Sequence, residues 1–153
     1  MREKRRVLII DDRSDDRARL SAFLERVGYT VEATDNLEKG EDYLERHLSH
    51  GTPIETLFLN QILNKAKTSS FFQRVDKTYV STGIILVFDR DEVVRGHDFY
   101  EREKITPVVC VQKPYLLEGS SGRHQIGDAL CYVDILRKEK LSKKVKSLKE
   151  EYA

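Results

Sequence analysis

Acidic and basic side chains stand directly after several apolar segments of the sequence. Asp11 and Asp12 follow "VLII", Asp89 follows "GIILVF", and Lys113 comes shortly after "VVCV". Carboxylates that converge with a lysine favour the binding of a divalent cation and metal-assisted phosphate chemistry. Asn60, at the end of "TLFLN", is the exception, because its amide is neutral and a poor nucleophile.

These side chains need a scaffold that brings them together. Five short segments, 7–10, 30–34, 56–59, 83–88 and 108–111, are β-rich, and four of them are apolar on both faces, as in the buried strands of a parallel sheet. Helical periodicity predicts helices from Asp15 to Gly28, from Asn36 to about Leu48, around 71–75, around 93–100, and from near Ser121 onward. The alternation predicts an α/β, doubly wound parallel sheet with helices on both faces, whose site lies at the carboxyl ends of the strands.

Composition sets the class of protein but names no partner. The 153 residues are one domain's length, and 27 basic side chains nearly cancel 26 acidic ones. Residues 137–153 hold seven Lys or Arg and three Glu, a net charge of +4, which leaves −3 for 1–136. We therefore expect a domain at 1–136 and a basic, helical C-terminal extension at 137–153. Two cysteines, no secretory signal and no long apolar run predict a cytoplasmic protein with free thiols and no membrane segment.

Two stretches of the chain carry a resemblance to a known family. The segment "VLIIDDRSDDRARLSAFLERVGYTVEATDNLEKG" resembles the opening of a response-regulator receiver domain, and "VQKPY" resembles its closing Lys-Pro motif. The resemblance spans residues 5 to about 136. It implies the flavodoxin-like receiver fold with strand order 2-1-3-4-5, a place in two-component or phosphorelay signalling, and a signalling protein such as a histidine kinase or an output protein as partner.

The resemblance also assigns roles to particular positions. Its Mg²⁺-binding acid pair falls on Asp11 and Asp12, and its lysine falls on Lys113. Four positions depart from the family pattern: Asn60 stands in place of the phosphoacceptor Asp, Phe88 in place of the hydroxyl residue, Asp89 in place of a small residue, and Cys110 in place of the aromatic switch.

Each departure weakens the family chemistry. The Asn60 amide cannot form an acyl phosphate by the usual route, Phe88 offers no hydroxyl, and Asp89 repels a phosphoryl group. We expect Mg²⁺ to bind Asp11 and Asp12 weakly or not at all, and no other cofactor. We also expect Lys113 to hydrogen-bond the Asn60 carbonyl oxygen and to pair with Asp11, Asp12 or Asp89. The prediction is a pseudo-receiver that is not an enzyme and is locked in either the resting or the active shape.

Three other functions stay open at this point. One is a small-ligand sensor that uses the strand-end crevice, with Phe88 as an apolar wall. Another is an unusual receiver phosphorylated on Asp89 or Asp12, although strand alternation predicts that the Asp89 side chain points away from the site. The third is an enzyme that uses the acids and Lys113, against which the chain has no Gly-rich phosphate loop.

Two surfaces are predicted to bind other proteins. The resemblance implies contacts through its fourth helix, fifth strand and fifth helix, here Val94, His97 and Tyr115. In the basic extension, Leu141, Val145 and Leu148 form a narrow apolar seam among lysines. The seam is coiled-coil-like and predicts a homodimer or a partner-docking helix, with a solvated extension as the alternative. The extension has no interleaved aromatic residues, which disfavours nucleic acid as partner.

Overall fold

The computed structural model describes residues 5–89, 109–113 and 119–151, with side chains in the last range from 125 onward. Within these residues, five strands form one parallel sheet in the order β2-β1-β3-β6-β7. The strands are β1 (Arg6–Ile10), β2 (Thr30–Thr34), β3 (Thr56–Asn60), β6 (Gly83–Phe88) and β7 (Val109–Gln112). Counted along the five predicted strands this order is 2-1-3-4-5, so the predicted fold class and strand order are confirmed.

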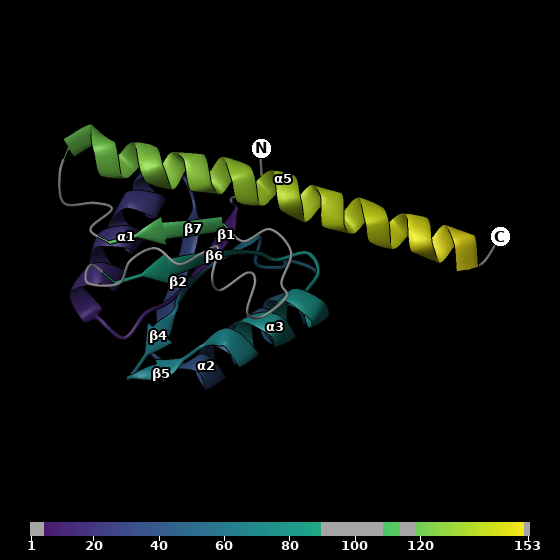
Figure 1. Ribbon diagram of the computed structural model, residues 1–153, viewed down its shortest axis with the longest axis horizontal. Coiled ribbons are helices and arrows are strands. Elements are labelled where there is room, and N and C mark those ends of the chain that lie inside the picture. The colour runs from purple at the N-terminus through teal and green to yellow at the C-terminus, as the bar shows by residue number, and fades with distance from the viewer. Residues whose placement is uncertain (1–4, 90–108, 114–118, 152–153) are drawn as a thin grey trace.

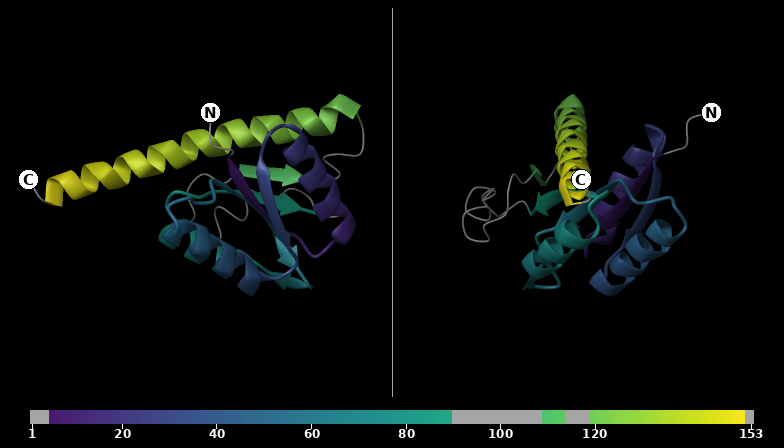
Figure 2. Two further views of the ribbon diagram at one scale, coloured as in Figure 1. Left: turned by 180° about the vertical axis from the view of Figure 1, so that it is seen from behind. Right: turned by 90° about the vertical axis from the view of Figure 1, so that its right-hand side faces the viewer.

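Helices cover both faces of the sheet (Figures 1 and 2). The helices are α1 (Ser14–Arg26), α2 (Leu37–Ser49), α3 (Ser69–Thr78) and α5 (Gly119–Glu151). The alternation of β1 explains the two layers, because Val7 and Ile9 pack with α1 and α5, whereas Leu8 and Ile10 pack with α2 and α3. The two apolar cores therefore lie on opposite sides of one sheet.

A β-hairpin that the sequence did not suggest follows β3. It consists of β4 (Ile62–Leu63) and β5 (Ala66–Lys67), paired antiparallel. The two residues between these strands, Asn64 and Lys65, have φ values of 51° and 67°. Positive φ at both central residues is the backbone of the tight hairpin turns, and asparagine tolerates it better than most residues.

Helix α5 is 33 residues long and starts close to the predicted Ser121. Its first half packs on the sheet through Ile126, Ala129 and Val133. Its second half runs past the edge of the domain (Figure 1). No helix among the described residues is long and apolar enough to span a membrane. The helix predicted around 93–100 lies outside the described residues, as do Val94, His97 and Tyr115, so the interaction face named for them stays a prediction.

Candidate functional site

The strand order brings the predicted polar residues to one edge of the sheet. Asp11 follows β1 and Asn60 ends β3, its neighbour in the sheet. Phe88 ends the next strand, β6, and its carbonyl oxygen accepts a hydrogen bond of 2.9 Å from the backbone N–H of Lys113, which follows β7. These residues are brought together because the carboxyl ends of parallel strands meet at the same edge.

The ammonium group of Lys113 is the centre of this site. Its Nζ lies 2.7 Å from Asp11 Oδ2, 2.8 Å from Asp16 Oδ2 and 3.3 Å from Asp89 Oδ1. The Lys113 side chain is only 8% exposed and that of Asp11 only 3%. One buried cation is therefore shared by three carboxylates, an arrangement that keeps each charge paired in a place where an unpaired charge is costly.

The pKa shifts of the two most buried groups follow from this pairing. Burial favours a neutral lysine, but the hydrogen bonds from Lys113 to Asp11 and Asp16 outweigh burial and raise the pKa of Lys113 above its ordinary value. Burial raises the pKa of Asp11, and the hydrogen bonds from Lys113 and from the Arg13 N–H offset only part of that effect. Lys113 is thus charged at neutral pH.

Asp16 was not among the site residues predicted from the sequence. It lies in the first turn of α1, and its charge suited the positive end of the helix dipole, which was a sufficient explanation for an acid at that position. Its position in the sequence could have indicated that it belongs to the site, because the first turn of a helix that follows a strand lies at the same edge of the sheet as the end of that strand. The side chain supplies one of the two shortest contacts to Lys113.

Asn60 does not bind Lys113, so that prediction was wrong. Its side-chain Nδ2 donates a hydrogen bond of 2.7 Å to the carbonyl oxygen of Ile62, and its Oδ1 is buried without a hydrogen-bond partner among the described residues. A carbonyl oxygen accepts only from an N–H or O–H, so Ile62 fixes which end of the amide faces it. Lys113 meanwhile has three carboxylates within reach. The amide is held by the loop after β3 and not by the lysine.

Asp12 faces the hairpin and not the lysine. Its Oδ2 accepts a hydrogen bond of 2.9 Å from the backbone N–H of Asn64, in the β4–β5 turn. Of the three carboxylates predicted as alternative partners of Lys113, Asp12 is therefore the one that does not contact it. Asp12 instead ties the turn of the hairpin to the end of β1.

Asp89 points into the site, contrary to the prediction from strand alternation. Strand β6 ends at Phe88, so the alternation of side chains no longer governs residue 89, and the ammonium of Lys113 attracts its carboxylate. Phe88 itself is 1% exposed and packs in the core on the α2 and α3 side of the sheet. It therefore offers no apolar wall to a ligand in the crevice.

Cys110, at the position of the family's aromatic switch, is partly buried against the same core. Burial raises the pKa of its thiol to about 11, so the thiol is protonated at neutral pH. Neither Cys110 nor Cys131 is in a disulfide.

The described residues do not fit the Mg²⁺ ion that the receiver resemblance implies. Asp11 uses Oδ1 for the Arg13 N–H and Oδ2 for Lys113, and Asp12 binds the Asn64 N–H. No group of three or more His, Cys, Asp or Glu side chains in the described part of the chain is arranged to hold a metal ion. Lys113 supplies the positive charge in the carboxylate cluster.

Comparison with known proteins gives structural but not sequence relatives. No protein-family model matches the sequence, and no curated protein matches it. A CheY-like response regulator receiver domain from Methanospirillum hungatei is similar in structure, with a TM-score of 0.67 and 18% identity over 90% of this chain and 99% of that chain. A response regulator receiver protein from Burkholderia phymatum gives a TM-score of 0.64 and 13% identity over 83% of this chain and 95% of that one.

NtrX from Brucella abortus, in complex with ATP, gives a TM-score of 0.67 and 14% identity over 95% of this chain, but only 29% of the NtrX chain. The chain has the flavodoxin-like receiver fold. At such identities the likeness establishes the fold alone. Any function has to be argued from the side chains at the strand ends.

Proposed function

We propose that this chain is a receiver-like signalling module that acts through protein–protein interaction and without phosphorylation, in a two-component or phosphorelay-type pathway. The observation that carries the proposal is the hydrogen bond of 2.7 Å from Asn60 Nδ2 to the Ile62 carbonyl oxygen. The residue at the end of the central strand β3 is neutral, buried and held by its own loop. Its partner is a signalling protein, such as a histidine kinase or an output protein.

The chemistry of the site supports a fixed structure in place of a switch. Phosphoryl transfer needs a nucleophilic oxygen and cations that neutralise the charge on the moving group. Asn60 supplies no such oxygen, and the Lys113 charge is already matched by Asp11, Asp16 and Asp89. An added phosphoryl group would meet three carboxylates. We therefore propose an interaction module with no enzymatic role and no resident cofactor.

The test is exposure to phosphodonors in the presence of Mg²⁺. The purified chain is incubated with acetyl phosphate and, separately, with beryllofluoride, and it is followed by intact-mass spectrometry and ¹H–¹⁵N NMR spectra. We expect no phosphoryl mass increment and no shifts of backbone signals around Asn60 and Lys113. A phosphoaspartate found by peptide mapping overturns the proposal, and its position at Asp12 or Asp89 would favour the receiver phosphorylated at another acid.

The function as a small-ligand sensor loses the apolar wall on which it depended, because Phe88 lies in the core. The buried Oδ1 of Asn60 has no hydrogen-bond partner in the described part of the chain, so a ligand with a hydrogen-bond donor could still bind there. Thermal-shift measurements with nucleotides, flavins and quinones would detect such a ligand as a higher melting temperature.

A further inference from the structure

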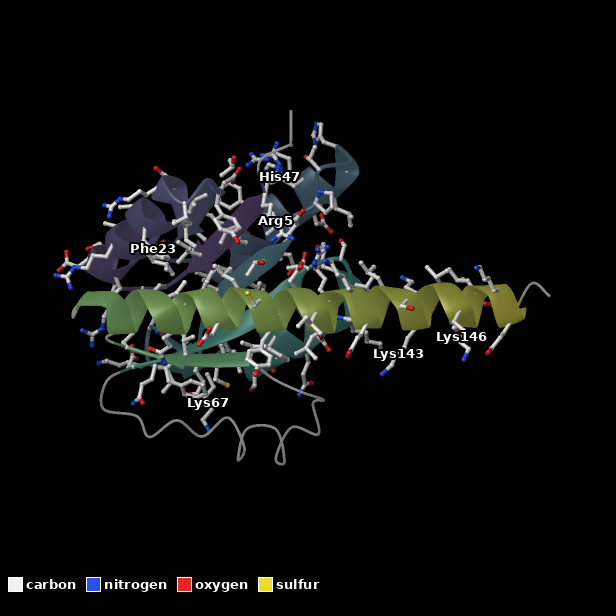
Figure 3. All side chains as sticks on the ribbon, turned by 90° about the horizontal axis from the view of Figure 1, so that it is seen from above. Arg5, Phe23, His47, Lys67, Lys143 and Lys146 are labelled. Atoms are coloured by element: carbon white, nitrogen blue, oxygen red, sulfur yellow. The ribbon has the colours of Figure 1, made fainter. Side chains whose placement is uncertain are left out.

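The end of α5 extends past the domain. Among the described residues, the last ion pair that joins this helix to the rest of the chain is from Lys140 Nζ to Asp76 Oδ1 of α3, at 2.8 Å, and the same ammonium also donates to the Asp76 carbonyl oxygen. Beyond it, the helix continues for about three turns, from Leu141 to Glu151, and we call this segment the free end of α5 (Figures 1 and 3).

The free end of α5 carries an apolar seam between basic side chains. Val145 is 50% exposed and Leu148 is 44% exposed, large values for apolar residues on a helix. The segment holds four lysines and two glutamates: Lys143, Lys144, Lys146, Lys149, Glu150 and Glu151. Figure 3 shows Lys143 and Lys146 on the stretch that projects from the domain. The free end of α5 therefore matches a partner surface that covers its apolar side chains and carries acidic groups around them.

Pairing of two free ends with each other does not meet that requirement. A parallel pair would place each lysine beside its own copy, and an antiparallel pair centred on Val145 would place Lys144 opposite Lys146. Like charges at such flanking positions oppose helix pairing. The apolar positions Leu141, Val145 and Leu148 also span only one heptad step, which is short for a stable coiled coil.

An acidic surface of the required kind exists on α2 of the same chain. A shallow groove runs along this helix beside α3, and we call it the acidic groove; its lining consists of Leu37, Glu38, Glu41, Asp42, Glu45 and Arg74. Arg74 forms an ion pair of 2.6 Å with Glu41. Glu38, Asp42 and Glu45 are exposed, and so is Leu48 at the end of the helix. The groove is thus mainly acidic, with Leu37 as its apolar residue, and the exposed Leu48 lies further along the same helix.

The free end of α5 cannot reach the acidic groove of its own chain. Helix α5 lies on the α1 side of the sheet and α2 lies on the other side, as the end-on view in Figure 2 shows. The helix is continuous through residue 151 and has no break at which it would fold back. A basic apolar helix and an acidic groove that match each other therefore meet only between two molecules.

We propose that the free end of α5 docks in the acidic groove of a second copy of this chain, and that two copies do so reciprocally. The reciprocal arrangement is closed by a two-fold axis and contains the contact twice. A one-way contact would leave one free end of α5 and one acidic groove unoccupied. Two helix contacts also bury more surface than one, and a stable interface needs about 1,200 Å² or more. The inference concerns a surface separate from the Asn60 site and does not depend on how that site works.

Charge reversal tests both surfaces at once. The tail variant is Lys146→Glu with Lys149→Glu, and the groove variant is Glu38→Lys with Asp42→Lys. Light scattering after size exclusion is run over a range of concentrations. The wild-type chain should form a dimer of twice 17.8 kDa, and each variant alone should associate about tenfold more weakly or worse. An equimolar mixture should recover the dimer, because both contacts are complementary again in the mixed pair.

A matched control tests whether the groove itself, and not the net charge of the chain, governs association. Asp15→Lys with Glu25→Lys reverses two exposed acids on α1 and changes the net charge by the same amount as the groove variant, so it should leave the dimer unchanged. Circular dichroism confirms that every variant is folded. A wild-type chain that stays monomeric at all concentrations overturns the inference. So does a groove variant that dimerises as well as wild type, which is the result that pairing between two free ends would give.

Discussion

The amide of Asn60 is oriented by the backbone of Ile62, two residues further along the chain. Nδ2 of Asn60 lies 2.7 Å from the Ile62 carbonyl oxygen, while its Oδ1 has no partner among the described residues. A carboxylate in the same place would set two oxygen atoms against each other, with no hydrogen between them. The loop after β3 therefore complements an amide and not an aspartate. The change at position 60 thus involves the surrounding loop as well as the loss of a nucleophile.

Asn60→Asp should therefore destabilise the fold at neutral pH. We expect a loss of about 1–3 kcal/mol in the free energy of unfolding, because a hydrogen bond is replaced by repulsion at a residue that is 1% exposed. Burial should raise the pKa of the new carboxyl, so the loss should shrink as the pH falls and the group becomes a donor to Ile62. Urea unfolding at pH 7 and pH 5, with and without Mg²⁺, measures both effects.

The matched control is Asn36→Asp. Asn36 is the N-cap of α2, and there the side-chain oxygen accepts a hydrogen bond of 3.0 Å from the Lys39 N–H. A carboxylate keeps that bond and suits the positive end of the helix dipole, so the control should be neutral or slightly stabilising. If both variants lose the same stability, the orientation of the Asn60 amide is not the cause. If Asn60→Asp gains tight Mg²⁺ binding without loss of stability, the pocket is intact around one missing charge.

Lys113→Met should be strongly destabilising, because it leaves Asp11, Asp16 and Asp89 facing one another without a cation. Loss of one partner of a buried ion pair costs about 3–5 kcal/mol. Without Lys113 the pKa of Asp11, already raised by burial, rises further. A raised folded-state pKa means that the deficit is full at pH 7 and shrinks as the pH falls through that pKa toward the unfolded value.

Denaturant unfolding of Lys113→Met at pH 7 and pH 4.5 measures this dependence. Lys39→Met is the control for loss of an exposed lysine and should change stability by less than about 0.5 kcal/mol. Adding Asp11→Asn to Lys113→Met should recover part of the loss, since it removes the most buried of the three carboxylates. Equal stability of Lys113→Met and wild type at pH 7 would contradict the role given to the lysine.

The fold could be predicted from sequence because its signals are local and repeated. Segments such as 83–88 are apolar on both faces, which only a sheet covered on both sides explains. The hairpin at 62–67 was not predicted, because two-residue strands carry no periodicity and its turn is Asn64-Lys65 with no glycine.

The members of the site were easier to predict than their contacts. Position at a strand end placed Asp11, Asn60 and Lys113 at one edge, since the parallel topology fixes where strand ends meet. The contacts between side chains depend on rotamers and on loop carbonyl groups such as that of Ile62. Neither can be inferred from residue type. For that reason the Lys113–Asn60 bond was wrong and Asp16 was missed.

Asp134 should make stability depend on acid pH. Its carboxylate contacts Arg5 Nη2 at 3.1 Å, Arg137 Nη2 at 2.8 Å and Lys138 Nζ at 3.0 Å, and so attaches α5 to the start of β1. Burial alone would raise the pKa of Asp134, but the hydrogen bonds from Arg137 and Lys138 lower it to about 2. Because the pKa of Asp134 is depressed in the folded state, the ionised carboxylate stabilises the fold at pH values above its ordinary pKa of about 4. This stabilisation is lost as the pH falls from about 4 to about 2.

Asp134→Asn should thus be less stable than wild type at pH 7, by up to about 1 kcal/mol for such a partly exposed network. The difference should disappear near pH 2. Thermal unfolding across this range measures it. Glu139→Gln, which removes an exposed carboxylate five residues further along α5, serves as control, and its unfolding curve should run parallel to that of wild type at all pH values. A difference for Asp134→Asn that persists unchanged at pH 2 would mean that packing and not charge is responsible.

Two glycines inside helices should respond in opposite ways to alanine. At Gly127 in α5 an added Cβ meets nothing within 4 Å, so Gly127→Ala should stabilise the chain by about 0.5–1 kcal/mol through helix propensity. At Gly40 in α2 the added Cβ would lie 2.4 Å from Cδ1 and 3.1 Å from Cγ1 of Ile10, a residue that is 0% exposed. Gly40→Ala should lose about 1–3 kcal/mol, because Ile10 has no space into which to move.

Urea unfolding of the two variants side by side isolates packing from backbone effects, since both changes are Gly to Ala in a helix interior. Adding Ile10→Val to Gly40→Ala removes Cδ1, the nearest atom, and should make the Gly40→Ala change less costly than it is in the wild-type background. That coupling distinguishes a clash with Ile10 from a general distortion of α2. A stabilising effect of Gly40→Ala would show that α2 can move away from β1, and that the close packing at this point does not hold the helix in place.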